Sequence, residues 1–186
     1  MAETKITAQY HSPIGAITLV GDGNSLTELH FIKGKDKKPQ SVENPKETKL
    51  QNHPAGQDLP VFTETCRWLD LYFNGIKPDF TPPIKPQGSA FQQKVWRELL
   101  AIPYGQTTTY GVVAKRLDCR SAQVIGQAIH RNPIAIIIPC HRVIGTNGSL
   151  TGYAAGLEIK QQLLQLENKL FFHIVPTNRS KTDQMR

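Results

Sequence analysis

A cysteine and a histidine stand side by side in the second half of the chain, as Cys140 and His141, and Arg142 follows them. A free thiol is only a few per cent thiolate at neutral pH, and an imidazole that takes its proton makes it a nucleophile. A carboxylate such as Glu167 can orient that imidazole and stabilise its cation. The pattern predicts nucleophilic chemistry at Cys140. An inert core thiol stays open as the alternative, because most lone cysteines behind an apolar segment are buried packing residues.

The segment before Cys140 is the β-branched run 134–138, which we expect to be a buried, extended piece of chain. Neighbouring side chains on an extended chain point to opposite sides, so a direct contact between Cys140 and His141 would be strained. A bridging water or a turned backbone would remove this difficulty.

The elements that must position these residues differ between the two halves of the chain. Alternating apolar residues predict strands within 6–31, with a hairpin formed by 14–20 and 26–31. Helical spacing of apolar residues predicts a helix over 61–73. The polar stretch 33–59 carries few apolar residues, so we expect a mobile loop there.

Helices dominate the second half. Ser89, Thr109 and Ser121 stand where helix N-caps are expected, and a last helix is predicted over 157–166. The helices that begin after Thr109 and Ser121 are short and are joined by a tight turn at 118–120, which predicts a helix-turn-helix.

Charge is unevenly distributed. The chain carries 22 Lys and Arg against 15 Asp and Glu, a net charge of +7. Residues 1–86 hold 10 of each sign, whereas residues 87–186 hold 12 basic and 5 acidic residues. Localised positive charge attracts polyanions such as nucleic acids, although a solvated basic face without a partner stays open.

These patterns together predict the α/β fold class and three regions. Residues 1–86 form an N-terminal domain with a small antiparallel sheet, a helix and a linker; residues 87–176 form a mostly helical domain with the candidate active site and the candidate nucleic-acid-binding helix-turn-helix; residues 177–186 form a flexible tail. Three scattered cysteines exclude a secreted disulfide framework and make a cysteine-rich zinc site unexpected, and no apolar run is long enough to span a membrane. We expect no membrane partner and a cytoplasmic protein, or a nuclear one in a eukaryote.

Residues 91–170 resemble the active-site domain of the O6-alkylguanine-DNA alkyltransferases, the methylated-DNA–protein-cysteine methyltransferases. Six stretches occur in the family's order and spacing: Pro103-Tyr104-Gly105, Thr109-Tyr110-Gly111, Asn132-Pro133, Ile138-Pro139-Cys140-His141-Arg142-Val143-Ile144, Gly152-Tyr153-Ala154-Ala155-Gly156-Leu157, and Leu163-Leu164 with Glu167. The first half resembles the family only in its length and its outline of strands and a helix, which is ribonuclease H-like.

The resemblance implies that Cys140 takes an alkyl group irreversibly from the O6 atom of a guanine that is flipped out of double-stranded DNA. Each molecule would act once, as a monomer, without a cofactor or a metal, and O4-alkylthymine is a second candidate substrate. His141 would act as the base through a water, Glu167 would hold His141, and Asn132 would brace the turn around the site. The hydroxyl of Tyr110 would stabilise the negative charge that develops on O6.

The resemblance also implies that the helix-turn-helix binds the minor groove. The implied substrate and DNA contacts are Thr109, Arg120, Gln123, Gly126, Ala128, Ile129, Arg131, Val143, Tyr153, Ala154 and Ala155. Among them, the backbone N–H of Ala154 would join the Tyr110 hydroxyl at O6, and the carbonyls of Cys140 and Val143 would bind the guanine amino group. Small residues on the second helix fit close packing against a neighbouring helix equally well.

One position departs from the family. Gln123 stands where the family usually has an arginine that fills the gap left by the flipped base, so we expect weaker DNA binding. Ala155 is a small residue at the rim of the expected pocket, which favours entry of bulky adducts. Two other classes use parts of the same pattern, a thiol hydrolase and a non-enzymatic helix-turn-helix protein that senses damage.

Overall fold

The computed structural model describes residues 5–32 and 59–168. The predicted loop at 33–59, apart from its last residue, and the predicted tail at 177–186 lie outside these residues. Within the described part of the chain, no helix is both long enough and apolar enough to cross a membrane.

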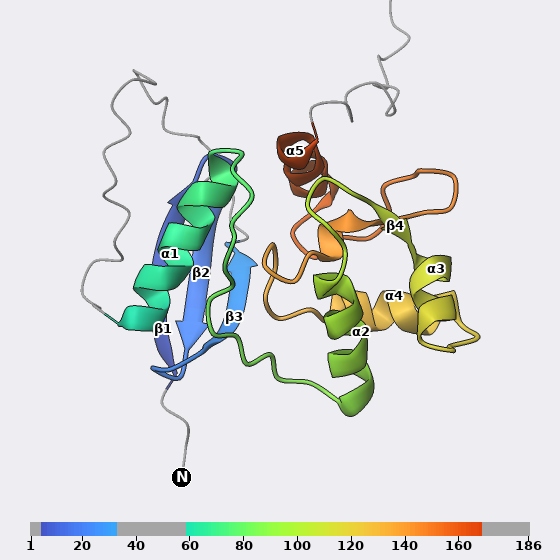
Figure 1. Cartoon of the computed structure of the whole chain (residues 1–186), viewed down its shortest axis with the longest axis horizontal. Coiled ribbons are helices and arrows are strands. Elements are labelled where there is room, and N and C mark those ends of the chain that lie inside the picture. Colours follow the sequence, from blue (N-terminus) through green and yellow to red (C-terminus); the bar gives the residue numbers. More distant parts are fainter. Residues whose placement is uncertain (1–4, 33–58, 169–186) are drawn as a thin grey trace, which may run out of the picture.

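The first half forms the predicted antiparallel sheet. Strands β1 (Ile6–Ser12), β2 (Gly15–Gly21) and β3 (Leu26–Phe31) lie in the order β1-β2-β3. Alternate residues of these strands, such as Ile17 and Leu19, are fully buried. Helix α1 (Pro60–Phe73) runs along one face of the sheet and packs its apolar side against it (Figure 1), as its helical spacing predicts.

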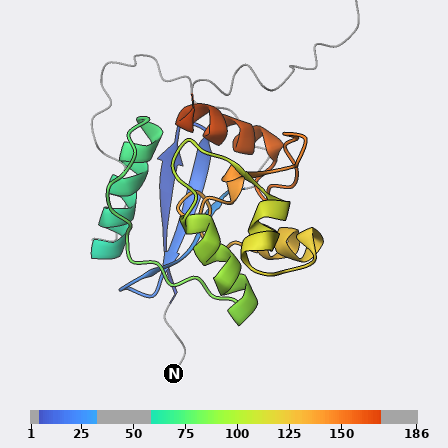
Figure 2. The same cartoon turned by 45° about the vertical axis from the view of Figure 1, so that its right-hand side comes forward.

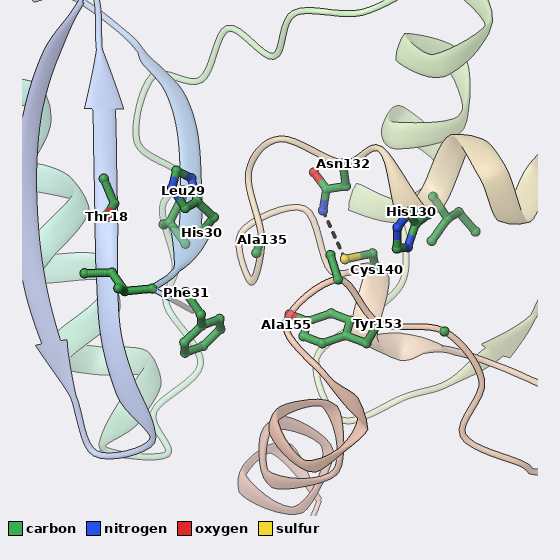
Figure 3. Close-up of a pocket in the computed structure, with 14 residues that line it drawn as sticks. Thr18, Leu29, His30, Phe31, His130, Asn132, Ala135, Cys140, Tyr153 and Ala155 are labelled. Atoms are coloured by element: carbon green, nitrogen blue, oxygen red, sulfur yellow. Dashed lines mark hydrogen bonds between the residues drawn. The ribbon is translucent and has the colours of Figure 1, made fainter. Parts of the chain in front are cut away.

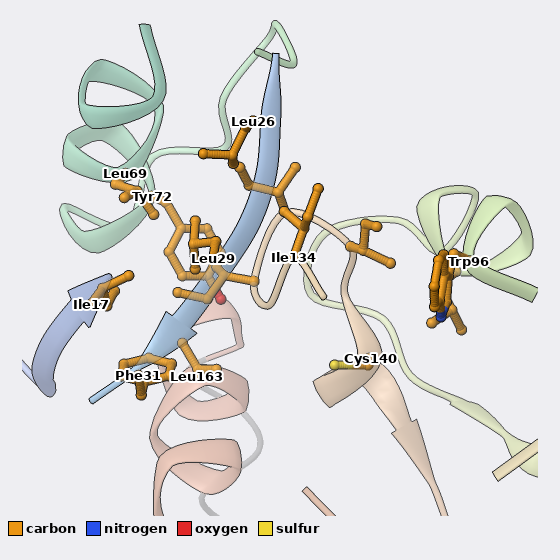
Figure 4. Packing of buried hydrophobic residues seen from close by; sticks show 14 of the residues in the cluster. Ile17, Leu26, Leu29, Phe31, Leu69, Tyr72, Trp96, Ile134, Cys140 and Leu163 are labelled. Atoms are coloured by element: carbon orange, nitrogen blue, oxygen red, sulfur yellow. The ribbon is translucent and has the colours of Figure 1, made fainter. Parts of the chain in front are cut away.

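The outer edge of β3 is where the two halves of the chain meet. The backbone N–H of Leu29 donates to the Pro133 carbonyl at 2.8 Å, and the N–H of Ala135 donates to the Leu29 carbonyl at 2.8 Å. An edge strand exposes unpaired backbone groups that need partners, and here the segment before the active site supplies them. Leu29 and Ile134 are fully buried on either side of this junction (Figure 4).

The second half contains the predicted helices, which lie beside the sheet in Figures 1 and 2. They are α2 (Ala90–Leu100), α3 (Tyr110–Arg116), α4 (Ala122–His130) and α5 (Leu157–Glu167). The side chains of Ser89, Thr109 and Ser121 cap α2, α3 and α4, as expected. Two short parallel strands, β4 (Thr108–Thr109) and β5 (Val143–Ile144), join the start of α3 to the segment after Cys140.

The prediction for 134–138 is right about burial but wrong about shape. The segment is a tight turn, because the N–H of Ile138 donates to the Ile134 carbonyl at 3.1 Å and Ile136 has a φ of 67°. A β-branched residue in this left-handed region is strained by about 1–3 kcal/mol. A run of buried β-branched residues indicates burial only. The turn itself is set by Asn132, whose side chain bonds both ends of it.

We expect Leu29→Ala to lower the free energy of unfolding by about 2–5 kcal/mol, because it removes a fully buried side chain at the junction of the two halves. Leu100→Ala is the matched control, since Leu100 is 42% exposed and should cost less than about 1 kcal/mol. Urea unfolding measures both values. Similar losses in the two variants would contradict the role of the junction.

Candidate active site

Cys140 lies at the start of a single 3-10 turn, η1 (Cys140–Arg142), that follows the turn at 134–138. The turned backbone allowed by the sequence is therefore present. Cys140 is only 8% exposed, and the side-chain amide of Asn132 donates to its sulfur at 3.1 Å (Figure 3). The same amide donates to the Ile138 carbonyl at 2.8 Å. Asn132 thus ties the sulfur to the turn that presents it.

Behind Cys140, His141 and Arg142 both contact the carboxylate of Glu167, at the end of α5. The Nε2 atom of His141 lies 2.6 Å from Oε1 of Glu167. Arg142 makes a bidentate ion pair with Glu167, with Nε donating to Oε2 at 2.8 Å and Nη2 donating to Oε1 at 3.0 Å. A bidentate pair of this kind is the strongest common form of ion pair. His141 is completely buried.

The partners of Glu167 determine which nitrogen of His141 carries the proton. Oε1 belongs to an ionised carboxylate, so it is an acceptor and the facing Nε2 of His141 is the donor. Nδ1 is then the unprotonated nitrogen of the neutral ring. Among the described residues, this buried Nδ1 has no hydrogen-bond partner. A basic lone pair is therefore left free beside the residue that carries the thiol.

Burial and charge set the ionisation of the three groups. Burial raises the pKa of the Cys140 thiol, although Asn132 and the charge of Lys160 act in the opposite direction. Burial lowers the pKa of His141, which keeps the ring neutral. Burial also opposes ionisation of Glu167, but its hydrogen bonds and charge interactions with His141 and Arg142 prevail and lower its pKa to about 2. The resting site holds a thiol, a neutral imidazole and a carboxylate.

A cavity of about 450 Å³ opens over Cys140, a volume within the range of small-molecule sites. Of the expected site residues, Ile129, Asn132, Cys140, Tyr153, Ala154 and Ala155 line it. The opposite wall comes from the sheet, including Thr18, His30 and Phe31 (Figure 3). No local sequence pattern indicates this wall, because it depends on how the two halves pack. His130, also missed, completes the rim beside Ile129.

Other expected site residues lie outside the lining of this cavity. The Tyr110 hydroxyl donates to the Thr151 carbonyl at 3.3 Å, and the Val143 carbonyl accepts from Lys160 at 2.7 Å. The side chain of Thr109 caps α3. On the helix-turn-helix, the side chains Arg120, Gln123 and Arg131 are exposed.

Gly126 and Ala128, the two small residues of α4 among the expected contacts, differ from each other. Ala128 is buried and its carbonyl accepts from the Trp96 indole at 2.9 Å, so packing against α2 explains it. Gly126 is half-buried, and a Cβ added there would lie 3.7 Å from the Tyr110 ring. Close packing of α3 on α4 thus accounts for the small residue at Gly126.

Two buried polar residues at the site were not predicted. Tyr72 of α1 donates its hydroxyl to Oε1 of Glu167 at 2.7 Å. Lys160 of α5 donates to the carbonyls of Val143 and Thr151, both at 2.7 Å, and burial lowers its pKa to about 8. The burial of Lys160 could have been predicted, because its helical spacing places it on the same face of α5 as Leu163, Leu164 and Glu167. No local pattern marks the partner of the Tyr72 hydroxyl.

The ionised Glu167 makes stability depend on pH. Because its pKa is about 2 in the folded protein against an ordinary 4.5, its contribution is complete above pH 4.5 and is lost as the pH falls towards 2. Glu167→Gln also leaves Arg142 without its charged partner. We expect this variant to be less stable than the parent by about 3 kcal/mol at pH 7, and the difference to shrink below pH 4.5.

Urea unfolding at a series of pH values checks this expectation. Glu64→Gln, at an exposed position of α1, is the control and should change stability by less than about 0.5 kcal/mol. A loss in Glu167→Gln that is the same at every pH would contradict the assignment.

Comparison with known proteins gives a consistent result. The family described as 6-O-methylguanine DNA methyltransferase, DNA binding domain, matches residues 90–169, and its ribonuclease-like domain matches residues 6–86. The chain is 46% identical over 161 residues to the methylated-DNA–protein-cysteine methyltransferase of Methanosarcina acetivorans, covering 86% of this chain and 96% of the relative. It is 42% identical over 160 residues to that of Haemophilus influenzae, covering 85% and 83%.

Solved structures agree with these relatives. The fold is similar to that of the Mycobacterium tuberculosis O6-methylguanine methyltransferase, with a TM-score of 0.71 and 36% identity over 94% of this chain and 97% of that chain. A structure of the Mycobacterium tuberculosis protein in complex with DNA has a TM-score of 0.69 and 39% identity, over 87% and 91%. Sequence identity at this level over nearly the whole length places the chain in the methylated-DNA–protein-cysteine methyltransferase family, the DNA-repair proteins that transfer an alkyl group from DNA to one of their own cysteines.

Proposed function

We propose that Cys140 removes the alkyl group from O6-alkylguanine in double-stranded DNA and keeps it as a thioether. One observation carries the proposal. The thiol of Cys140 lines a cavity of about 450 Å³, while His141, next to it in the chain, has a free Nδ1 and is bound through Nε2 to a buried carboxylate. This is the arrangement that an activated cysteine nucleophile needs.

The reaction is a displacement at a saturated carbon. The thiol proton passes through a water to Nδ1 of His141, and the resulting thiolate attacks the alkyl carbon in line with the C–O6 bond. The S–C bond forms as the C–O6 bond breaks, the electron pair stays on O6, and the guanine recovers a proton from the site. Glu167 stabilises the transient imidazolium because its pKa of about 2 keeps it ionised.

Asn132 holds the sulfur in position for this attack. Its amide donates to Sγ at 3.1 Å and lowers the energy of the thiolate, while the same side chain bonds both ends of the turn at 134–138. A sulfur that is already oriented loses little entropy on reaching the transition state. Asn132 therefore both positions the sulfur and stabilises its negative charge.

The substrate guanine has to leave the base stack to reach the sulfur of Cys140, a residue that is only 8% exposed. Ile129, Tyr153, Ala154 and Ala155 then form the walls around it. The buried hydroxyl of Tyr153 has no partner among the described residues and is free to bond the base. The hydroxyl of Tyr110 has to leave the Thr151 carbonyl before it joins the N–H of Ala154 at O6.

Binding to the minor groove is assigned to the exposed face of the helix-turn-helix, with Gln123 inserted into the gap left by the flipped base. Arg120 and Arg131 flank it and are exposed, so they are placed to contact phosphates. A single chain supplies the nucleophile, its relay and this face, and we propose that the protein acts as a monomer.

Mass spectrometry after incubation with a duplex that contains O6-methylguanine tests the chemistry. The protein should gain the mass of one CH2 unit, located on Cys140, and the DNA should be repaired in a one-to-one ratio. Cys140→Ala should gain nothing, whereas Cys119→Ala, at a half-buried thiol in the turn of the helix-turn-helix, should react like the parent. Repair beyond one lesion per molecule, or turnover of a peptide or ester, would point to a thiol hydrolase instead.

Gln123→Arg tests the assignment of the groove. An arginine adds a charge and a larger stacking surface at the inserted position, so we expect DNA affinity to rise several-fold and the salt dependence of binding to steepen. Gln9→Arg adds the same charge at an exposed position of β1, away from the helix-turn-helix, and should leave affinity nearly unchanged. Equal affinity of Gln123→Arg and the parent would refute the assignment.

A further inference from the structure

Tyr72 connects the ribonuclease-like half of the chain to Glu167 and His141, the pair that we call the catalytic relay. It lies on the last turn of α1, is completely buried, and donates its hydroxyl to Oε1 of Glu167 at 2.7 Å. The same hydroxyl lies 3.4 Å from Nε2 of His141. The expected catalytic residues all belong to the other half of the chain, so this contact crosses between the two family domains.

The position of the hydroxyl is fixed by the packing of its ring. The ring of Tyr72 stacks on that of Trp68, with centroids 5.3 Å apart. It also makes T-shaped contacts with the rings of Tyr104 and His141, at centroid distances of 6.0 Å and 6.5 Å. A ring held on several sides loses little conformational freedom when its hydroxyl bonds a partner. Tyr72 is thus built to direct one donor at one carboxylate oxygen.

That donor completes the set around Glu167. Oε1 faces Tyr72, Nε2 of His141 and Nη2 of Arg142, whereas Oε2 accepts from Nε of Arg142 and from the N–H of Gly105. A carboxylate with donors on both oxygens is held in one orientation. Without the tyrosine hydroxyl, Oε1 would keep only Nε2 of His141 and Nη2 of Arg142 as donors, so its negative charge would be less compensated.

We infer that Tyr72 is a positioning residue for alkyl transfer, whose hydroxyl shares Oε1 of Glu167 with His141 and thereby keeps Nδ1 of His141 free to accept the thiol proton. The inference rests on the proposed function, since it assigns to the N-terminal half a part in the same reaction. The hydroxyl acts through Glu167 and His141 and does not contact the substrate.

The pH dependence of the reaction depends on every group around His141. The groups next to His141 are Tyr72 from α1, Cys140 and Arg142 from η1, and Lys160 and Glu167 from α5. Tyr104, from the segment after α2, contacts Tyr72 and Arg142, and Tyr153, from the loop before α5, interacts with Cys140 and Glu167. Arg142 and Lys160 disfavour a proton on His141, whereas Glu167 favours it. Tyr72 partly neutralises Glu167 by its hydrogen bond, so its removal strengthens the pull of Glu167 on that proton.

Tyr72→Phe tests the inference, because it keeps the ring contacts and removes only the hydroxyl. We expect the single-turnover rate of methyl transfer to fall about five- to tenfold while DNA affinity is unchanged. His141 should hold its proton to a higher pH, so the acid limb of the pH–rate profile should move to higher pH. In ¹⁵N NMR of the free protein, the ring of His141 should stay doubly protonated to a higher pH than in the parent.

Tyr10→Phe is the matched control. Tyr10 is also a buried tyrosine of the first half, and its hydroxyl donates to Asp70 at 2.8 Å, away from the relay. This variant should lose stability like Tyr72→Phe but keep the parent's rate, pH profile and His141 spectrum. The inference is overturned if Tyr72→Phe keeps the parent's pH profile and the parent's titration of His141, or if Tyr10→Phe changes them equally. A parent protein that takes up no methyl group overturns the proposed function, which is a different result.

Discussion

An ionised carboxylate in the protein interior is costly unless its partners satisfy it, and Glu167 is such a group. Four parts of the chain meet at its two oxygens: α1 through Tyr72, the segment after α2 through Gly105, η1 through His141 and Arg142, and α5, which carries it. Removing any donor leaves a buried charge less compensated. The requirement to satisfy this carboxylate therefore fixes the relative positions of these elements, and with them the orientation of His141.

The Cys140 thiol is held by a second arrangement, a strained turn. The turn at 134–138 places Ile136 at a φ of 67° with its side chain fully buried, and Asn132 closes the turn with hydrogen bonds to both ends. The apolar contacts of the run and the bonds of Asn132 together offset the strain of the turn. Since Asn132 also bonds Sγ of Cys140, the backbone that exposes the thiol to the cavity and the group that stabilises it are one unit.

The sheet contributes to function through its edge. Strand β3 bonds the backbone on both sides of Ile134 through Leu29, and residues near its end form the far wall of the cavity over Cys140. The ribonuclease-like half is thus part of the site in two ways, as a wall and as the source of the Tyr72 hydroxyl. The interface between the halves is also where Leu29 and Ile134 bury their side chains, so stability and site geometry depend on the same contacts.

The sequence by itself determined what depends on neighbours in the chain. Capping residues placed the starts of α2, α3 and α4, apolar spacing placed α1 and α5, and Cys140 beside His141 with Glu167 at a helix end indicated the chemistry. Only the tertiary structure decided the turn at 134–138, the sheet wall of the cavity and the partner of Tyr72. Tyr72 and Glu167 are 95 positions apart, and their bond exists only because the C-terminal ends of two helices from different halves come together in the folded chain. Local patterns record burial and periodicity, whereas the direction in which a buried polar group finds its partner is set by long-range packing.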